Sequence, residues 1–414
     1  MRHALLAAVV QVSASLAAGP ALAGPLRITT GTIEEDCAST PLEFEIRGVP
    51  ESLEVVLKPG AGGEAVPCQV AERSDRGVRI VWVAPRLAKG TTATWQVDTV
   101  PAPSAPPASG PKPRVEVKAS GTDFQVLIDG KEFTRLVADP AGRKPYLYPV
   151  IGPHGKMITR QFPMKAGVEG EEQDHPHQRS IWFTHGDVGG VNFWSEGNRA
   201  GSIRQTKAAR TASGPVFGRI ETSNEWIAPG EKKLLDDRRI LTIYPLERGE
   251  VLLDISITLT PAGDSVVFGD TKEGSFGVRL DESMKEKRGG TIVNARGQRG
   301  MNQAWGKPAE WVDYTGMSGG AKVGVAILDH PESFRHPTHW HVRDYGLFAA
   351  NPFGYRDFYR DKSKDGSFTL EKGKTMTFRY RVYFHNGGAE EASVAEVYRG
   401  FAKPPALHPS PLER

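Results

Sequence analysis

The sequence lacks a strong net charge and any long apolar run beyond its first residues. Its 414 residues carry a formal net charge of only +3 with both signs mixed, which gives no support for a nucleic-acid surface. No later stretch approaches the roughly 18 uninterrupted apolar residues of a membrane-spanning helix. We therefore expect neither a nucleic-acid partner nor membrane insertion.

Local motifs that mark several enzyme classes are also missing. The chain has no G-x-S-x-G nucleophile elbow, no H-E-x-x-H zinc helix and no haem motif. The glycine-rich turn at 186–190 has no strand–turn–helix setting, so it is no phosphate-binding loop. Neither heptads nor a repeat of roughly 20–50 residues is present, which excludes repeat architectures.

The first 23 residues are typical of a secretory signal peptide. A short basic start precedes a mostly apolar run over 4–16, and Ala21-Leu22-Ala23 is an A-x-A cleavage site. We therefore expect a periplasmic or extracellular protein. In such an oxidising compartment the only two cysteines, Cys37 and Cys68, predict one disulfide, with two buried free thiols as the alternative.

Proline and glycine divide the mature chain into strand-rich parts. Short alternating runs over 24–100 predict a small antiparallel β-sandwich. The proline-rich segment 101–113 is a linker that cannot join a packed core. Strand patterns dominate 114–401, where we expect a large sandwich of two curved antiparallel sheets and one helix at 389–401, before a C-terminal tail at 402–414. The expected fold class is all-β.

Two histidine-rich segments, 174–187 and 336–345, hold the candidate site. His175 precedes Pro176, which favours an extended backbone, and alternate side chains of an extended chain share one face. We expect the two segments to form opposite walls of one pocket. The polar residues of these walls are His175, His177, Arg179 and His185 in the first segment and His339, His341 and Arg343 in the second.

Histidines at this spacing leave the question of metal open. A His-x-His pair on a strand places two imidazoles about 6–7 Å apart on one side, a familiar metal-binding spacing. The alternatives are a metal-free pocket that binds sugar hydroxyls and purely structural histidines. Because Arg179 and Arg343 lie close by, and their fixed charge disfavours a neighbouring cation, we expect no metal or other cofactor. The residues that would hold a divalent metal are His175, His177, His339 and His341.

A carboxylate and two tryptophans complete the candidate set. Glu273 follows Lys272 just before an alternating strand, where it can serve as a general base or bind a sugar hydroxyl. Alone, this pair is more typical of an exposed turn, in which an ion pair contributes less than about 1 kcal/mol. Trp194 and Trp340 adjoin the polar segments and suit the apolar face of a sugar ring, although a β-sandwich core also needs aromatic bulk.

Together the segments 174–188, 271–274 and 339–345 resemble a bacterial exported family of unknown function labelled "methane oxygenase PmoA". The likeness covers roughly 115–401, and the His-Pro-His and His-Trp-His motifs are its specific part. Gln178 departs from it, since histidine or a similar polar residue is expected there. The label does not describe the chemistry, because the membrane subunit of particulate methane monooxygenase is a bundle of transmembrane helices.

The resemblance implies an enzyme-like protein directed at saccharides. The sequence is also similar in pattern to the galactose mutarotase-like supersandwich proteins, in which a histidine acid and a glutamate base flank the sugar ring. We therefore expect a carbohydrate-active enzyme of epimerase, glycoside hydrolase or lyase type. The alternatives are a non-catalytic glycan-binding protein and a metal-dependent oxidase. The expected catalytic residues are His175, His177, Glu273 and His341, and the expected substrate-binding residues are Arg179, His185, Trp194, Lys272, His339, Trp340 and Arg343.

Overall fold

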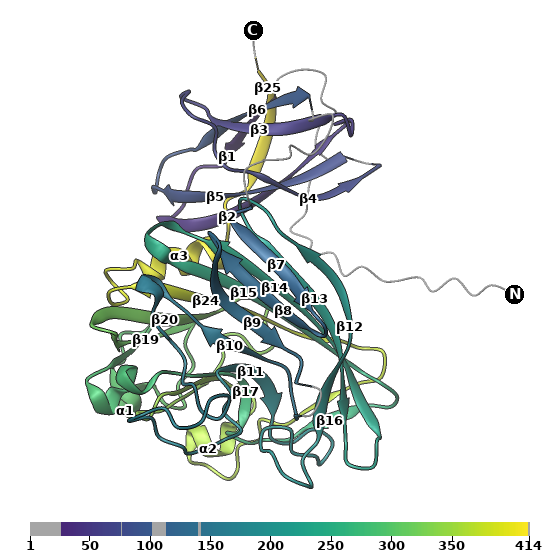
Figure 1. Ribbon diagram of the computed structural model, residues 1–414, viewed down its shortest axis with the longest axis vertical. Coiled ribbons are helices and arrows are strands. Elements are labelled where there is room, and N and C mark those ends of the chain that lie inside the picture. Colours follow the sequence, from purple (N-terminus) through teal and green to yellow (C-terminus); the bar gives the residue numbers. More distant parts are fainter. Residues whose placement is uncertain (1–25, 76, 102–112, 140–141, 413–414) are drawn as a thin grey trace, which may run out of the picture.

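A computed structural model describes most of the chain, and strands dominate it (Figure 1). The predicted signal peptide at 1–23 and most of the predicted linker lie outside the described residues. No helix in the described part is long and apolar enough to span a membrane. The described residues are 26–75, 77–101, 113–139 and 142–412. The α-helices found there are α1 (Gly300–Ala304), α2 (Tyr355–Tyr359) and α3 (Val394–Ala402).

The N-terminal part is a small sandwich of two antiparallel sheets, in the order β25-β1-β6-β3 and β2-β5-β4. In β2 the buried Leu42, Phe44 and Ile46 alternate with Glu43 and Glu45, so one face of the strand is apolar and packs into the core. Its strands are β1 (Leu26–Thr30), β2 (Cys37–Arg47), β3 (Leu53–Pro59), β4 (Gln69–Ser74), β5 (Gly77–Leu87), β6 (Thr94–Pro101) and β25 (Leu407–Pro411).

The disulfide prediction is wrong, because both Cys37 and Cys68 are free thiols. Cys37 pairs with Leu87 of β5, whereas Gln69, the neighbour of Cys68, pairs with Val81 of the same strand. The cysteines are therefore offset by about five residues along β5, or roughly 17 Å. A disulfide needs Cα atoms within about 7 Å. Each thiol instead donates to a backbone carbonyl, at 3.4 Å.

The second part is a large sandwich of two eight-stranded antiparallel sheets, which confirms the all-β fold class. The first large sheet has the order β21-β22-β17-β11-β10-β9-β8-β7, and the second has the order β12-β13-β14-β15-β24-β20-β19-β18. The strands of the first are β7 (Val115–Ser120), β8 (Asp123–Ile128), β9 (Lys131–Val137), β10 (Tyr146–Val150), β11 (Ile181–His185), β17 (Gly274–Arg279), β21 (Trp340–Val342) and β22 (Leu347–Ala350). Those of the second are β12 (Ser202–Ala212), β13 (Gly218–Ile227), β14 (Lys233–Pro245), β15 (Val251–Pro261), β18 (Thr291–Asn294), β19 (Trp311–Ser318), β20 (Ala321–Asp329) and β24 (Met376–Asn386). A separate pair is formed by β16 (Val266–Phe268) and β23 (Phe368–Leu370).

Aromatic side chains fill the space between the two large sheets. Phe183 and Phe276 of the first sheet meet Phe378 and Tyr380 of the second, with ring centroids 5.1–5.2 Å apart in the facing pairs. Tilted and offset arrangements at this distance are the favoured geometry of aromatic pairs. This apolar core covers one face of the first sheet. The opposite face is therefore the one that can carry polar residues.

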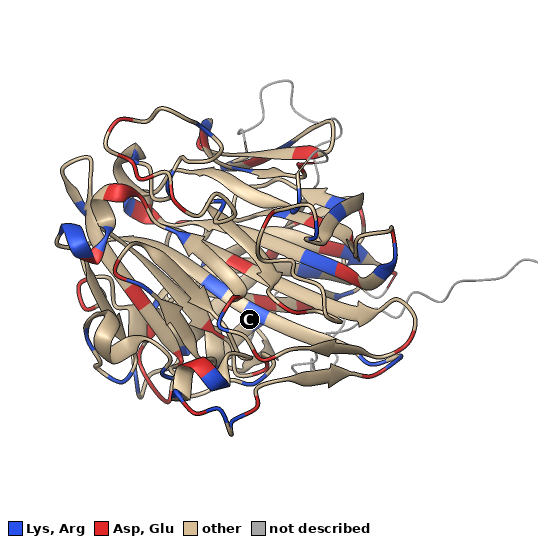
Figure 2. Cartoon of the chain, turned by 90° about the horizontal axis from the view of Figure 1, so that it is seen from below, with Lys and Arg blue, Asp and Glu red and all other residues tan. Residues whose placement is uncertain are grey.

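The two sandwiches are connected by side-chain packing, by hydrogen bonds and by the C-terminal segment of the chain. Segment 402–414, predicted to be a tail, supplies β25, which pairs with β1 and so returns the chain to the small sandwich. Val81 of β5 belongs to the same buried cluster as Phe217 of the large sandwich. The side-chain oxygen of Gln69 accepts hydrogen bonds from two backbone N–H groups of the large sandwich, at 3.0 and 2.9 Å. In Figure 2, acidic and basic residues are interspersed over the loops and strand ends of the described chain.

Candidate functional site

One row of residues crosses the first large sheet on the face that points away from the core. From strand to strand His341 lies opposite Ala349, Ala349 opposite Gly277, Gly277 opposite Trp182, and Trp182 opposite Tyr146. The strand neighbours of these residues face the core, so the row lies on the other, outer face. A Cβ on Gly277 would lie 2.7 Å from the indole of Trp182, which shows that this ring covers the glycine.

The segment before β11 lies against this face as a turn. The N–H of Gln178 donates to the carbonyl of His175 at 3.0 Å, and His175 has a φ of 44°. The prediction that His175 is extended is therefore wrong. The physical reason is a tertiary tie: the buried guanidinium of Arg160 donates to the carbonyl of His175 at 3.0 Å and holds the turn in place.

The turn brings two imidazoles and two aromatic rings together. The rings of His175 and His177 are 5.6 Å apart, edge to face. His175 stacks on Tyr345 at 5.3 Å with an interplanar angle of 5°, and His177 lies 6.1 Å from Trp194. Trp194 in turn packs on Trp182, at 5.2 Å. The first histidine-rich segment is thus fixed against the outer face of the sheet, next to the second.

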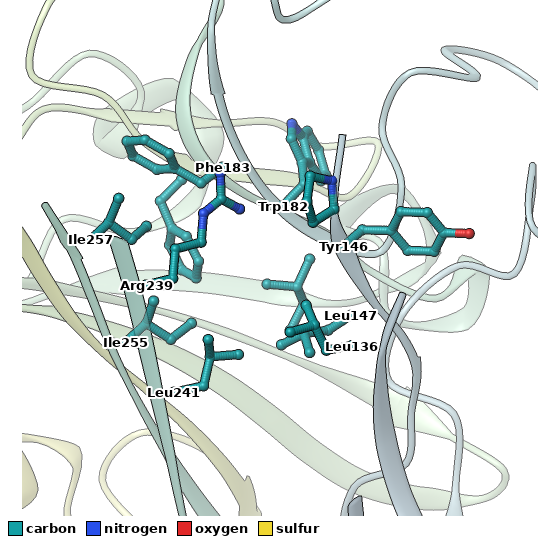
Figure 3. A pocket seen from close by; sticks show the side chains of 12 residues that line it. Leu136, Tyr146, Leu147, Trp182, Phe183, Arg239, Leu241, Ile255 and Ile257 are labelled. Atoms are coloured by element: carbon teal, nitrogen blue, oxygen red, sulfur yellow. The ribbon is translucent and has the colours of Figure 1, made fainter. Parts of the chain in front are cut away.

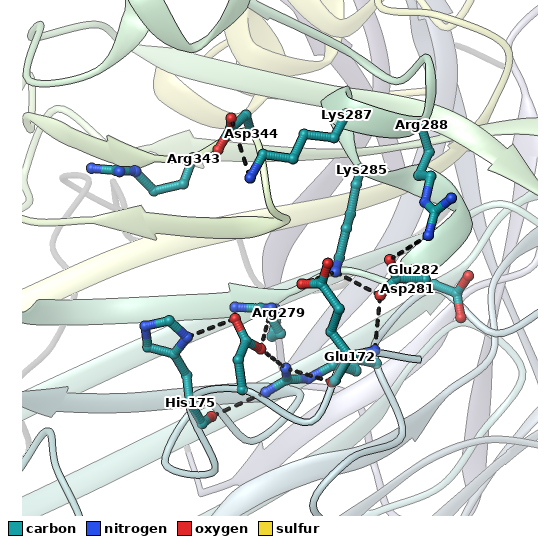
Figure 4. Close-up of polar contacts among 12 residues, drawn as sticks. Glu172, His175, Arg279, Asp281, Glu282, Lys285, Lys287, Arg288, Arg343 and Asp344 are labelled. Carbon is teal, nitrogen blue, oxygen red and sulfur yellow. Dashed lines mark hydrogen bonds and ion pairs between the residues drawn. The ribbon is translucent and has the colours of Figure 1, made fainter. Parts of the chain in front are cut away.

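A buried charge cluster supports this turn from below (Figure 4). Asp174 accepts hydrogen bonds from Arg160 and Arg279, whose side chains are both fully buried, and its second oxygen lies 2.7 Å from Nδ1 of His175. Burial favours the neutral acid, but Arg279, His175 and Arg160 outweigh it and hold the pKa of Asp174 well below its usual value. The guanidinium of Arg279 also lies 4.7 Å from the ring centre of Tyr345.

His341 is held in one tautomer beside Glu273. Its Nδ1 donates to the carbonyl of Lys272 at 2.7 Å, so Nε2 carries the free lone pair of the neutral ring. Burial lowers the pKa of His341 to about 4, although the charge of Glu273 opposes this. The side chains of Lys272 and Glu273 form an ion pair at 3.1 Å, and the ring of Trp305 lies 6.3 Å from His341.

His177 is a second neutral imidazole, and the charge of the same carboxylate affects its pKa. Burial lowers its pKa to about 4, the charge of Lys144 acts in the same direction, and Glu273 opposes them. No hydrogen bond ties its ring to any other described residue. Glu273 therefore acts on the pKa of both His177 and His341, and the three side chains form one electrostatic group.

The second histidine-rich segment also contributes a cation. The guanidinium of Arg343 lies 5.6 Å from the ring centre of Tyr345 and lowers the pKa of that tyrosine, which burial raises overall. In Figure 4 the side chain points away from the Asp344–Lys287 pair. We call the set His175, His177, Glu273, His341, Arg343 and Tyr345 the outer-face cluster.

Comparison with known proteins places the chain in a family. The model of "Family of unknown function (DUF6807)" matches residues 123–399, which cover the large sandwich except β7 and include the whole outer-face cluster. The chain belongs to family DUF6807. No curated protein matches the chain. The likeness to the PmoA-labelled family and to the galactose mutarotase-like proteins stays a prediction.

Several residues predicted for the site lie elsewhere in this DUF6807 chain. His185 is on the core side of β11, where it donates to the carbonyl of Gly269 at 2.8 Å and packs 4.5 Å from Phe353. Trp340 is fully buried on the core side of β21 and donates to the carbonyl of Ala309 at 2.9 Å. Strand parity is the reason, because both residues alternate with side chains of the outer face.

Two further predicted residues are occupied by intramolecular contacts. His339 lies on the same side as His341, but its Nε2 is 3.0 Å from the hydroxyl of Tyr359 and its ring stacks on Phe358 of α2. Arg179 forms a two-point ion pair with Glu196, both bonds measuring 2.9 Å. Trp194 is buried beneath His177 and serves as its support.

The structure also shows functional residues that the sequence did not single out. Arg160 and Arg279 shape the turn, and Tyr345 forms its stacking partner. Buried Lys144 donates to Glu196, and burial lowers its pKa to about 8. Arg279 had a local signal, the alternation along β17, and Tyr345 lies in the histidine-rich segment 336–345. The others come together through loops whose tertiary placement no local pattern encodes.

Neither a metal centre nor a large internal cavity emerges from the described residues. Within the described ranges, no group of three or more His, Cys, Asp or Glu side chains could hold a metal ion. The cavity in Figure 3 measures about 30 Å³, room for about one water and far too little for a sugar. A larger hollow of about 580 Å³ opens on the surface beside Glu171, Glu282 and Arg288 and contains none of the predicted site residues. The outer-face cluster is where the predicted side chains meet. The residues around the cavity are Leu136, Pro145, Tyr146, Leu147, Ile181, Trp182, Phe183, Arg239, Leu241, Ile255, Ile257 and Phe276.

Proposed function

We propose that this protein is a carbohydrate-active enzyme of the isomerase, hydrolase or lyase type, whose saccharide substrate binds at the outer-face cluster. The observation that carries the proposal is the convergence of one carboxylate and two neutral imidazoles. Glu273, His177 and His341 come from three distant segments of the chain, and Glu273 acts on the pKa of both histidines. Clusters of titratable groups with displaced pKa values are typical of active sites.

The arrangement suits proton transfer at a sugar. Each of the three reaction types needs one group that accepts a proton and one that donates a proton. The Nε2 lone pair of His341 is the acceptor, because the Lys272 carbonyl fixes the proton on Nδ1. His177 has no hydrogen-bond partner among the described residues, so its imidazole is available to a substrate hydroxyl. Glu273 binds a second hydroxyl or stabilises the imidazolium that forms on either ring.

The surroundings supply what a sugar needs in addition to proton transfer. Tyr345 and Trp305 are only partly buried, and aromatic faces pack well against the apolar face of a pyranose ring. His175 is the most exposed imidazole of the cluster, with a side-chain exposure of 42%, and can donate to or accept from a hydroxyl. The cluster therefore combines apolar contact with hydrogen-bonding groups, as ligand sites do.

A substrate screen with product analysis tests the proposal. Aldoses and oligosaccharides are incubated with the protein, and the products are examined for changed configuration, new reducing ends or unsaturated ends. We expect turnover by one of these routes, and we expect His177→Ala and His341→Ala to lower kcat/KM by about 100-fold or more. His408→Ala is the matched control, since His408 is an exposed histidine of β25 in the small sandwich. Saturable binding without chemical change would instead identify a glycan-binding protein.

A further inference from the structure

We infer that the saccharide recognised at the outer-face cluster is acidic and that its carboxylate binds the guanidinium of Arg343; this inference rests on the function proposed above. It names the substrate class, which the catalytic group alone leaves open. Three observations support it: the unpaired state of Arg343, the pairing of the surrounding charges with one another, and its position next to His341.

Arg343 forms no ion pair or side-chain hydrogen bond with any described residue. Its Nε is buried without a partner, and no dashed contact reaches the side chain in Figure 4. Other arginines in this region are paired: Arg279 with Asp174, and Arg179 with Glu196. Leaving a partly buried guanidinium without an anion costs free energy, which a carboxylate from a ligand would recover.

The charges around Arg343 are paired with one another and leave Arg343 without an anion. Asp174 is shared by the buried guanidinium groups of Arg160 and Arg279, and Glu273 is paired with Lys272 at 3.1 Å. The other acids nearby also have partners: Asp344 lies 3.7 Å from Lys287, Glu196 binds Arg179, and Glu172 binds Lys285. A cation left unpaired in such surroundings favours an anionic ligand.

The position of Arg343 joins this charge to the proposed chemistry. Arg343 follows His341 by two residues at the end of β21, so the two side chains are on the same side of the chain, and the charge of Arg343 lowers the pKa of His341. Arg343 and His175 also contact the same ring, Tyr345, at 5.6 and 5.3 Å. A sugar carboxylate held by Arg343 would therefore leave the ring of that sugar beside Tyr345 and His341.

The planar fork of arginine matches a carboxylate with two parallel hydrogen bonds. The chain itself shows this geometry, since Nε and Nη2 of Arg179 each donate to one oxygen of Glu196 at 2.9 Å. Because Nε of Arg343 is buried, its two terminal nitrogens form the fork that can bind a carboxylate end-on. We therefore commit to a uronate-containing saccharide, and a sulfate ester of a neutral sugar becomes an arm of the test.

Calorimetric titration of the full chain tests the inference. The ligands are oligogalacturonides, alginate oligosaccharides and heparosan oligosaccharides, compared with neutral cello-, malto- and xylo-oligosaccharides. We expect at least one acidic ligand to bind ten times more tightly than every neutral one. Arg343→Gln should weaken that binding about tenfold or more. Arg343→Lys keeps the charge but loses the planar fork, so its affinity should lie between those of the wild-type protein and Arg343→Gln. Arg27→Gln is the control, because Arg27 is an exposed arginine of β1 that forms no ion pair with any residue the structure describes.

Each possible result of this experiment supports or overturns the inference. Equal affinity for acidic and neutral ligands, or unchanged affinity in Arg343→Gln, overturns the inference. A sulfated oligosaccharide that binds as tightly as the uronates overturns the carboxylate assignment. Turnover of a neutral sugar that depends on His341 leaves the proposed function standing and removes the acidic substrate. Binding of uronates through Arg343 without turnover supports the acidic ligand and removes the proposed enzymatic function. If no saccharide binds, both the proposed function and the acidic ligand are contradicted.

Discussion

Asp174 shows how single residues hold the outer-face cluster in place. It lies between two arginines whose side chains are completely buried, and it also orients His175. A buried ion pair gains little over an apolar replacement, but removal of one partner leaves an uncompensated charge inside the protein. The two arginines are therefore dependent on one carboxylate, and the turn that carries both imidazoles is dependent on the arginines.

We predict that Asp174→Asn lowers the free energy of unfolding by about 3 kcal/mol, the lower end for a broken buried pair, because Asp174 is itself 33% exposed. Denaturant unfolding measures the loss. The matched control is Glu172→Gln, which removes another carboxylate of the same loop while its partner Lys285 keeps Glu282 at 2.6 Å. The control should cost less than about 1 kcal/mol. A similar loss in both variants would contradict the special role of Asp174.

The pH dependence of activity follows from the two neutral imidazoles. Burial lowers the pKa of His177 and of His341 to about 4, and protonation of either would remove its lone pair. The group needed for activity is thus present above that pKa and lost as the pH falls through it. We predict that kcat/KM is independent of these histidines from about pH 5.5 upward and declines towards pH 4. An acidic limb centred near 6.5, the value of an ordinary histidine, would contradict this assignment.

At the scale of elements, alternation of apolar and polar residues predicted the strands well. Among the strand patterns within 114–401, the alternating residues at 251–259 lie in β15, and most of those at 375–385 lie in β24. These strands have one buried face, so their period is visible in the sequence. The helix expected at 389–401 begins only at Val394, because local periodicity does not fix where a helix starts.

The sequence predicted those site residues whose side-chain type alone indicates a chemical role. The sequence indicated His175, His177, Glu273, His341 and Arg343, and the structure brings them together. It did not indicate how they meet. The 174–178 turn is held by contacts with residues of β17 and of the loop that precedes the turn. These contacts are tertiary and leave no local pattern in the sequence.

The outer face of β17 depends on the absence of a side chain at Gly277. A Cβ there would lie 2.7 Å from the indole of Trp182, and that ring has no free direction because Trp194 packs on it. We predict that Gly277→Ala destabilises the protein by about 1–3 kcal/mol, the usual cost of overpacking. Thermal unfolding and near-ultraviolet circular dichroism measure the effect. Gly263→Ala is the control, since nothing lies within 4 Å of its Cβ, and unchanged stability at Gly277 would contradict the packing.

At the scale of the whole molecule, the two sandwiches form one structural unit. Strand β25 carries the chain back from α3 to β1, and the cluster that contains Val81 and Phe217 crosses the boundary. Of the outer-face cluster, His341 lies in β21, and the other residues lie in the loops before β11, before β17 and after β21. In Figure 1, β11 and β17 lie in the part of the large sandwich away from the small one. The small sandwich therefore contributes to stability and not directly to the site.

We predict that Gln69→Ala destabilises both sandwiches together. Its side-chain oxygen accepts from the N–H groups of Val216 and Phe217, and the loss leaves two buried donors unpaired, which costs about 2 kcal/mol or more. Unfolding should remain a single transition at a lower denaturant concentration. Gln125→Ala, which removes a side-chain bond between neighbouring strands to Glu132, is the control and should change little. Separate transitions of the two sandwiches would contradict the shared core.

The central claim is that Glu273 and His341 act as one catalytic unit. The most direct test is a double-mutant cycle of kcat/KM on the saccharide that the screen identifies, with Glu273→Gln, His341→Ala and the double variant. Residues that act together are strongly non-additive. The account predicts that the double variant is no more than a few-fold slower than the slower single variant. Losses that multiply, or full activity in either single variant, would contradict it.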